Sequence, residues 1–350
     1  MEACAHKLTL DWVRNPRPAS GMFSSITTGL SFLLKKNPRA RTCFNQPVDV
    51  PLIRPLTLLA LHQKALSEAR AICLPTFHGK TGHPPLIPYS ALPHILAWQG
   101  DKGLACAMQK LPQSLVEVPD AMILHDMDKP CDYQRLCQLA PSTEFLHPRE
   151  ARELLRIQQV SAKGLRHGKA VGAVAAHFAY TLARARRQKG ESPKLFPWLA
   201  RSGGLLYDLA KGSARHEEAA ANMLCAMQLP LMARLVRDHW DLTLTALQAI
   251  SKRELVYLAD KNCYGSSFVS LDQRFGQKIQ NAPDPQSAQA IAVRRQHAKD
   301  LATRLAMEIG KKPEVLAYEA LQQKTTFCKM LPLRSHAQAD NLRDNDKALD

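Results

Sequence analysis

The sequence predicts an α/β domain followed by an all-α domain. Over residues 7–135, short apolar runs alternate with helix-like stretches, which is typical of crossover units over a mostly parallel sheet. Residues 139–150 hold turn and capping residues without periodicity, which predicts a domain boundary. From 151 to about 282, apolar residues recur at three- and four-residue spacing, so we expect helices throughout.

The individual elements follow from these patterns. We expect strands within 7–13, 39–53, 69–77 and 114–124, and helices over 24–34, 55–69, 104–111 and 131–140. The second part predicts helices over 151–160, 170–187, 216–227, 229–240 and 251–260, then a basic amphipathic helix over 288–312 and a frayed polar end at 335–350. The expected domains are therefore 1–140 and 161–282, with a linker at 141–160 and a basic helical tail at 283–350.

Composition limits the class of protein. The chain has 350 residues, 45% of them hydrophobic, and a net charge of +16. The basic excess attracts phosphates, but it is dispersed and lacks the interleaved aromatic residues that stack nucleic-acid bases, so we do not expect nucleic acid as a partner. The nine cysteines form no CxxC pair, and no stretch approaches the roughly 20 apolar residues of a membrane span, so we expect a soluble, cytoplasmic protein without a membrane partner.

The helical part carries histidines and acids on apolar stretches. His167 begins HGKAVGAVAAHFAYTL, Asp208 lies in LLYDLAKG, and Asp260 lies in YLADK. In their order and small-residue context, these segments resemble the HD metal-dependent phosphohydrolases over about 120 residues. The resemblance implies that these three residues bind a divalent metal, which could be Mn, Fe, Ni, Zn or Mg. It also implies that His216 and His239 bind a second metal or the substrate phosphate.

Spacing adds a catalytic pair to this expectation. Asp208 and Lys211 are three residues apart on one helical turn, so a metal carboxylate and a phosphate-directed ammonium can face one pocket. A bound metal would lower the pKa of a water that attacks phosphorus. The family places a histidine directly before the aspartate, whereas this chain has Tyr207. A neutral phenol is a poor ligand, so the site either works with three ligands or binds without turnover.

Four segments of the first part carry a second resemblance. NPRPASGMFSSITTGL, FNQPVDVPLI, FHGKTGHPPLIP and ILHDMDKPCDY occur in the order found in the molybdenum-cofactor nucleotidyltransferases. These proteins have a Rossmann-like sheet, of which the first part would form a partial version. The resemblance implies that Asp49 binds Mg²⁺, that Ser24 and Ser25 lie near the nucleotide, that Gly82 and His83 line the pterin side, and that Asp126 lies at the rim.

One family feature is missing from this part. The family opens with a strand, a Gly-rich loop and a lysine that cradle the nucleotide phosphates, and this chain has no such motif. We therefore expect an unpaired strand edge, which a second copy of the chain or a partner chain could cover. Either the chain is truncated relative to a longer parent, or the first part has a structural or ligand-binding role.

The main functional hypothesis is a metal-dependent phosphohydrolase acting on a nucleotide or pterin phosphoester, fused to a nucleotidyltransferase-like domain. Two alternatives remain. The first is nucleotidyl transfer to molybdopterin as the main activity. The second is a non-catalytic scaffold for cofactor maturation. In each case the expected ligand is a small phosphorylated molecule, either a nucleotide or molybdopterin.

Overall fold

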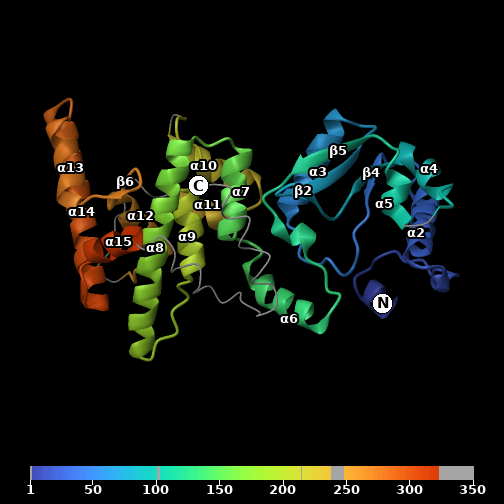
Figure 1. The fold of residues 1–350 in the computed structure, drawn as a ribbon, viewed down its shortest axis with the longest axis horizontal. Helices are drawn as coiled ribbons and strands as arrows, with labels where there is room; N and C mark the ends of the chain where they lie inside the picture. Colours follow the sequence, from blue (N-terminus) through green and yellow to red (C-terminus); the bar gives the residue numbers. More distant parts are fainter. Residues whose placement is uncertain (1, 101–102, 214, 238–247, 323–350) are drawn as a thin grey trace. The chain divides into compact units, whose positions relative to one another are not determined.

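The computed structural model describes residues 2–100, 103–213, 215–237 and 248–322 (Figure 1). Contacts between residues divide the chain into two compact units. Unit 1 comprises Met1–Ile157 and Met227–Leu229, and unit 2 comprises Gln158–Ala226 and Pro230–Asp350. Unit 1 combines a mixed sheet with helices, and unit 2 is largely helical, so the predicted fold class is confirmed.

The sheet of unit 1 is built around strand β2. Its strands are β1 (Thr42–Phe44), β2 (Ile72–Phe77), β3 (Lys80–Thr81), β4 (Leu86–Pro88) and β5 (Gln113–Glu117). β5 pairs with β2 in parallel, from Ile72 opposite Gln113 to Thr76 opposite Glu117. β3 and β4 pair with β2 antiparallel, and β1 pairs with β4 antiparallel. In the described part of this sheet, β1, β3 and β5 each pair with a single strand.

The expectation of a mostly parallel sheet is wrong, because β2–β5 is the one parallel pair among the described strands of this sheet. The cause is a two-residue hairpin between β2 and β3. His78 and Gly79 both have positive φ, of 48° and 73°. Two positive φ values in succession give the turn that reverses a strand onto its neighbour, so the chain returns antiparallel instead of crossing over.

Helices cover both faces of this sheet. The helices of unit 1 are α1 (Glu2–Lys7), α2 (Met22–Lys36), α3 (Pro55–Ser67), α4 (Leu92–Leu96), α5 (Gly103–Met108), α6 (Pro130–Leu139) and α7 (Pro148–Ile157). Ile72 and Leu74 of β2 pack in one cluster with residues of α2, α4 and α5. Cys73, between them, packs in another with Leu61 and Ala65 of α3. This alternation is the period of two that places neighbouring strand residues on opposite faces.

Two predicted features of unit 1 differ from the structure. The strand expected within 7–13 does not form; α1 ends at Lys7, and Leu8, Leu10 and Trp12 are exposed. The segment expected as a linker contains α7, where Glu150 and Glu153 are almost completely buried. Buried partners in unit 1 hold α7, and periodicity alone does not reveal such partners.

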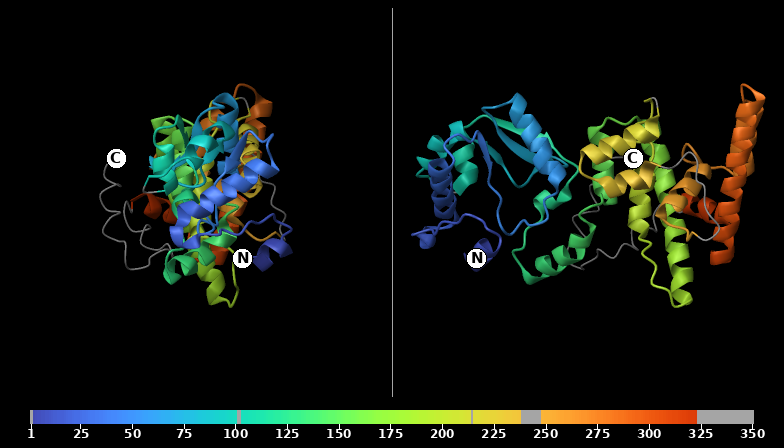
Figure 2. Two further views of the ribbon diagram at one scale, coloured as in Figure 1. Left: turned by 90° about the vertical axis from the view of Figure 1, so that its right-hand side faces the viewer. Right: turned by 180° about the vertical axis from the view of Figure 1, so that it is seen from behind.

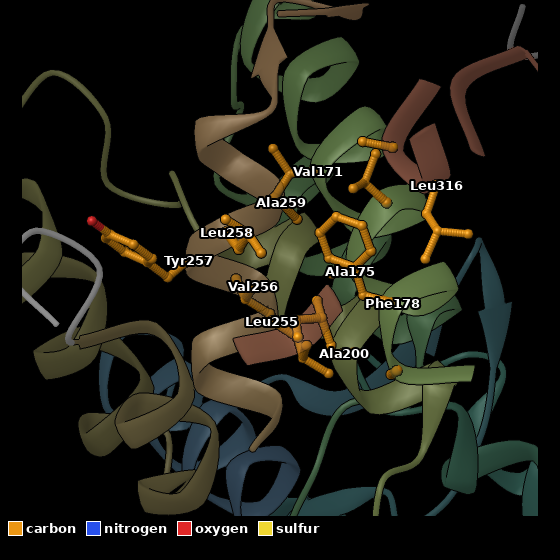
Figure 3. Packing of buried hydrophobic residues seen from close by; sticks show 14 of the residues in the cluster. Val171, Ala175, Phe178, Ala200, Leu255, Val256, Tyr257, Leu258, Ala259 and Leu316 are labelled. Carbon is orange, nitrogen blue, oxygen red and sulfur yellow. The ribbon is translucent and has the colours of Figure 1, made fainter. Parts of the chain in front are cut away.

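Helix α8 is the centre of unit 2. The elements of this unit are α8 (Ala162–Gln188), α9 (Pro197–Leu206), α10 (His216–Ala226), α11 (Pro230–Arg237), α12 (Lys252–Lys261), β6 (Cys263–Tyr264), β7 (Ser267–Phe268), α13 (Leu271–Gln280), α14 (Pro285–Ile309) and α15 (Pro313–Gln322). Val171, Ala175 and Phe178 of α8 are buried at four- and three-residue spacing against residues of α9, α12 and α15, as Figure 3 shows. This spacing places them on one helix face.

The predicted basic tail belongs to this helical unit. Helix α14 packs beside α13 and also contacts α8, α12 and α15 (Figure 2). Its residues Ala298, Leu301 and Leu305 are buried at three- and four-residue spacing. The apolar face that the sequence predicts for this helix therefore packs in the core of unit 2.

None of the described helices is both long enough and apolar enough to span a membrane.

Candidate functional sites

Three residues that the sequence singled out come together in unit 1. Asp49 lies in the loop between β1 and α3, His83 between β3 and β4, and Asp126 between β5 and α6. The charges of Asp49 and Asp126 both act on the imidazole of His83 and favour its protonation. Burial outweighs them and lowers the pKa of His83, so its imidazole is neutral near pH 7. We call these three residues the acidic site.

Backbone contacts fix the geometry of the acidic site. The His83 backbone N–H donates to the carbonyl of Ile123 at 3.0 Å, and the Gly82 N–H donates to the carbonyl of Pro75 at 2.9 Å. A Cβ atom on Gly82 would lie 2.3 Å from the Ile123 carbonyl oxygen. Only glycine permits this approach, and it ties the His83 loop to the turn that leads into Asp126.

The acidic site suits a hard cation. Among the residues that the structure describes, no salt bridge joins Asp49 or Asp126 to a lysine or arginine. The Nδ1 atom of His83 is buried and has no hydrogen-bond partner in the described part of the chain. Carboxylate oxygens without a protein cation are the ligands that Mg²⁺ prefers. These carboxylates have the chemistry of Mg²⁺ ligands, but the described residues contain no group of three or more histidine, cysteine, aspartate or glutamate side chains arranged to hold a metal ion, so Mg²⁺ binding here stays a prediction.

Ser24 and Ser25 lie in the first turns of α2. The Asn15 side-chain amide donates to Ser24 Oγ at 2.8 Å and to Ser25 Oγ at 2.9 Å. Ser24 Oγ donates in turn to the Gly21 carbonyl at 2.8 Å, where Gly21 has a φ of 82°. These contacts order the loop internally, and in the described residues no hydrogen bond links it to the acidic site. Nucleotide contact by Ser24 and Ser25 stays a prediction.

A buried charge network supports the acidic site, and sequence reasoning missed it. Arg54, directly before α3, places Nη1 2.6 Å from Asp120 Oδ1 and 2.5 Å from Glu150 Oε1. Its Nη2 donates to Glu150 Oε2 at 2.9 Å and to the Phe145 carbonyl at 3.0 Å. All three charged side chains are at least 98% buried. Burial opposes the charge of Arg54, but the Glu150 and Asp120 carboxylates prevail and raise its pKa.

The two carboxylates of this network also bind backbone amides. Asp120 accepts from the Met122 N–H at 3.1 Å, and Glu150 accepts from the Ala121 N–H at 2.9 Å. The turn Ala121–Leu124 is thereby fixed just before Asp126. The sequence feature that could have indicated this network is a charged residue within an apolar run, such as Arg54 in PLIRPLTLL.

Two partly buried histidines are expected to make the stability of unit 1 depend on pH. Burial, with the charges of Arg135 and Arg149, lowers the pKa of His125 to about 4, and burial with the charge of Arg54 lowers the pKa of His147 to about 4. An unfolded histidine has a pKa of about 6.5. Between these values the unfolded chain binds more protons than the folded chain, so stability should fall as the pH drops from about 6.5 towards 4.

Urea unfolding at pH 7 and pH 5 checks this prediction. His147→Gln should lose less stability between the two values than the wild type, because glutamine cannot take up the proton. Burial raises the pKa of Glu150, so protonation of this residue favours the folded chain as the pH falls. This contribution is present in both the wild type and His147→Gln. His94→Gln, at an exposed position of the same unit, is the control. The same pH dependence in wild type and His147→Gln would contradict the prediction.

In unit 2 the structure brings together the three predicted metal ligands. His167 comes from α8, Asp208 follows α9, and Asp260 lies near the end of α12. His167 Nδ1 donates to the Gly265 carbonyl at 2.9 Å, so its Nε2 points towards the carboxylates. Nε2 lies 3.1 Å from Asp260 Oδ1 and 3.8 Å from Asp208 Oδ2. We call His167, Asp208 and Asp260 the histidine–aspartate cluster.

Protein cations surround both carboxylates of this cluster. Lys211 Nζ lies 2.5 Å from Asp208 Oδ2, and Lys261 Nζ lies 3.0 Å from Asp260 Oδ2. Arg274 Nη2 lies 3.5 Å from the same Asp260 oxygen. Burial opposes ionisation of Asp260, but Lys261, His167 and Arg274 hold its pKa well below the usual value.

These residues do not fit a divalent metal in their present arrangement. The part of the chain that the structure describes has no group of three or more histidine, cysteine, aspartate or glutamate side chains arranged to hold a metal ion. Tyr207 directly precedes Asp208, and burial and the Asp260 charge raise its pKa well above the usual value. A protonated phenol is a poor ligand. His216 Nε2 is 3.8 Å from Asp208 Oδ1, and His239 lies outside the described residues.

The roles of Lys261 and Arg274 were not visible in the sequence. Lys261 was part of the YLADK segment but was assigned no function, and Arg274 reaches the cluster from α13. Their contacts depend on how α12 and α13 pack, which a linear pattern does not specify.

Comparison with known proteins identifies one part of the chain. Searches of curated proteins and of solved structures gave no match. A family model matches residues 1–116, so the matched segment ends before Asp126. No HD domain is identified in the helical region. Asp49, Ser24, Ser25, Gly82 and His83 lie within the matched segment. Residues 1–116 match the family described as the MobA-like NTP transferase domain.

Proposed function

We propose that unit 1 binds a nucleoside triphosphate with Mg²⁺ and transfers its nucleotidyl group to a phosphorylated acceptor of the molybdopterin type. The observation that carries the proposal is the acidic site, two of whose three residues lie within the segment that matches the MobA-like NTP transferase domain. In such a transfer the acceptor phosphate attacks the α-phosphorus. The bond between the α-phosphorus and the bridging oxygen breaks, and pyrophosphate leaves.

Each residue of the acidic site has a role in this proposal. Asp49 and Asp126 would hold Mg²⁺, which neutralises phosphate charge when bound. His83, neutral and with an unpaired Nδ1, would form a hydrogen bond to the acceptor. Arg135 and Arg149 act electrostatically on His125, next to Asp126, and so add a positive field that attracts a phosphate group.

For unit 2 we propose a non-catalytic role rather than metal-dependent hydrolysis of a nucleotide or pterin phosphoester. Convergence of His167, Asp208 and Asp260 supports a hydrolase. The salt bridges of Lys211, Lys261 and Arg274 to the same carboxylates oppose it, because they occupy the oxygens that a metal would need. A structural role for the cluster within unit 2 accounts for both observations.

Calorimetric titration of the full chain tests the nucleotidyltransferase proposal. CTP and GTP are titrated in the presence of Mg²⁺, and pyrophosphate release is followed with molybdopterin as acceptor. Asp49→Asn should weaken nucleotide binding by at least about 10-fold, as loss of a metal contact commonly does. Asp11→Asn, at an exposed position of the same unit, should bind as the wild type does. Failure of the wild type to bind either nucleotide, or equal binding by Asp49→Asn, would overturn the proposal.

A further inference from the structure

The side chain of Lys261 is fixed inside unit 2. Lys261 is the last residue of α12 and is 9% exposed. Its ammonium lies 3.0 Å from Asp260 Oδ2, 3.5 Å from the Tyr207 hydroxyl and 4.8 Å from the centre of the Tyr257 ring. A carboxylate, a phenol oxygen and an aromatic face are all groups that stabilise a buried cation.

Basic side chains around the histidine–aspartate cluster outnumber its carboxylates. Two carboxylates face three basic side chains, the mostly exposed Lys211 and the buried or nearly buried Lys261 and Arg274. A divalent ion between the carboxylates would add two further positive charges within a few ångströms of these groups. In a partly desolvated site water screens such repulsion poorly, so the added charge would oppose metal binding.

Tyr207 completes this arrangement. Its side chain is 4% exposed, and it directly follows α9, beside Asp208. The phenol oxygen accepts a hydrogen bond from Lys261, an ammonium contact that an imidazole bound to a metal could not make. Tyr207 therefore provides a hydrogen-bond partner for the lysine.

We infer that the histidine–aspartate cluster is a metal-independent ion-pair centre, in which the ammonium of Lys261, held by Asp260 and Tyr207, takes the place of a divalent cation. The centre joins α8, the end of α9, α12 and α13 through charged side chains. It holds these helices together with protein cations alone. This inference concerns unit 2 and stands apart from nucleotide binding by unit 1.

Metal content tests the inference in the full chain. Protein stripped with a chelator is dialysed against Mn²⁺, Ni²⁺ or Zn²⁺, and bound metal is counted by elemental analysis. Because we propose that the acidic site of unit 1 binds Mg²⁺, metal in unit 2 is counted as the difference between the wild type and His167→Gln. We expect no difference. One additional metal per chain in the wild type would overturn the inference.

A gain-of-function variant gives the positive arm of this test. Tyr207→His with Lys261→Met places an imidazole beside Asp208 and removes the ammonium. The double variant should bind one metal per chain more than the wild type, and this metal should be lost when His167→Gln is added. Tyr207→His with Lys252→Met, which alters another lysine of α12, should not. If the first pair gains no metal, or both pairs gain it equally, Lys261 does not replace the cation.

Discussion

Arg54→Leu should lower the free energy of unfolding by about 3–5 kcal/mol, the usual cost of removing one partner from a buried ion pair. Arg54 is 2% exposed, and its guanidinium contacts both Asp120 and Glu150. Leucine would fill part of the volume but leave two carboxylates buried without a cation. The loss therefore comes mainly from uncompensated charge and much less from an empty cavity.

Urea unfolding of the full chain measures this effect. Arg70→Leu serves as the control, since Arg70 is exposed in the same unit, and it should change stability by less than about 0.5 kcal/mol. Adding Glu150→Gln to Arg54→Leu should recover part of the loss, because one of the stranded charges disappears. A loss below about 1 kcal/mol for Arg54→Leu, or no recovery in the double variant, would show that the network contributes little.

The helices of unit 2 could be predicted because their packing repeats along the sequence. On α8, Val171, Ala175, Phe178 and Leu182 follow helical spacing and are all buried. The sheet of unit 1 was harder to predict. β3 has two residues and β4 has three, which is too short for an alternating pattern to appear. The mixed topology depends on the turn at His78 and Gly79, whose effect on strand direction was not recognised.

The sites show the same division between local and distant information. Asp49, His83 and Asp126 were named from motifs in three separate segments, and the fold brings them together. The Arg54 network could not be found this way, because its partners are 66 and 96 residues away in the sequence. The positive surroundings of the histidine–aspartate cluster were missed for the same reason. Motifs identify the residues of a site, whereas tertiary packing determines which charges compensate them.

Gly204→Ala should destabilise unit 2 by about 1–3 kcal/mol, as overpacking at a close contact does. A Cβ atom on Gly204 of α9 would lie 2.6 Å from the Gly172 Cα and N atoms of α8, and backbone cannot move aside as a flexible side chain can. The two helices must separate, which also weakens the contact between His167 and Asp208. Gly276→Ala on α13 is the matched control, because its Cβ would meet nothing within 4 Å. Alanine there should stabilise the helix by up to about 1 kcal/mol. Urea unfolding of both variants should therefore give changes of opposite sign, and a Gly204→Ala protein as stable as the wild type would mean that α8 and α9 do not pack this closely.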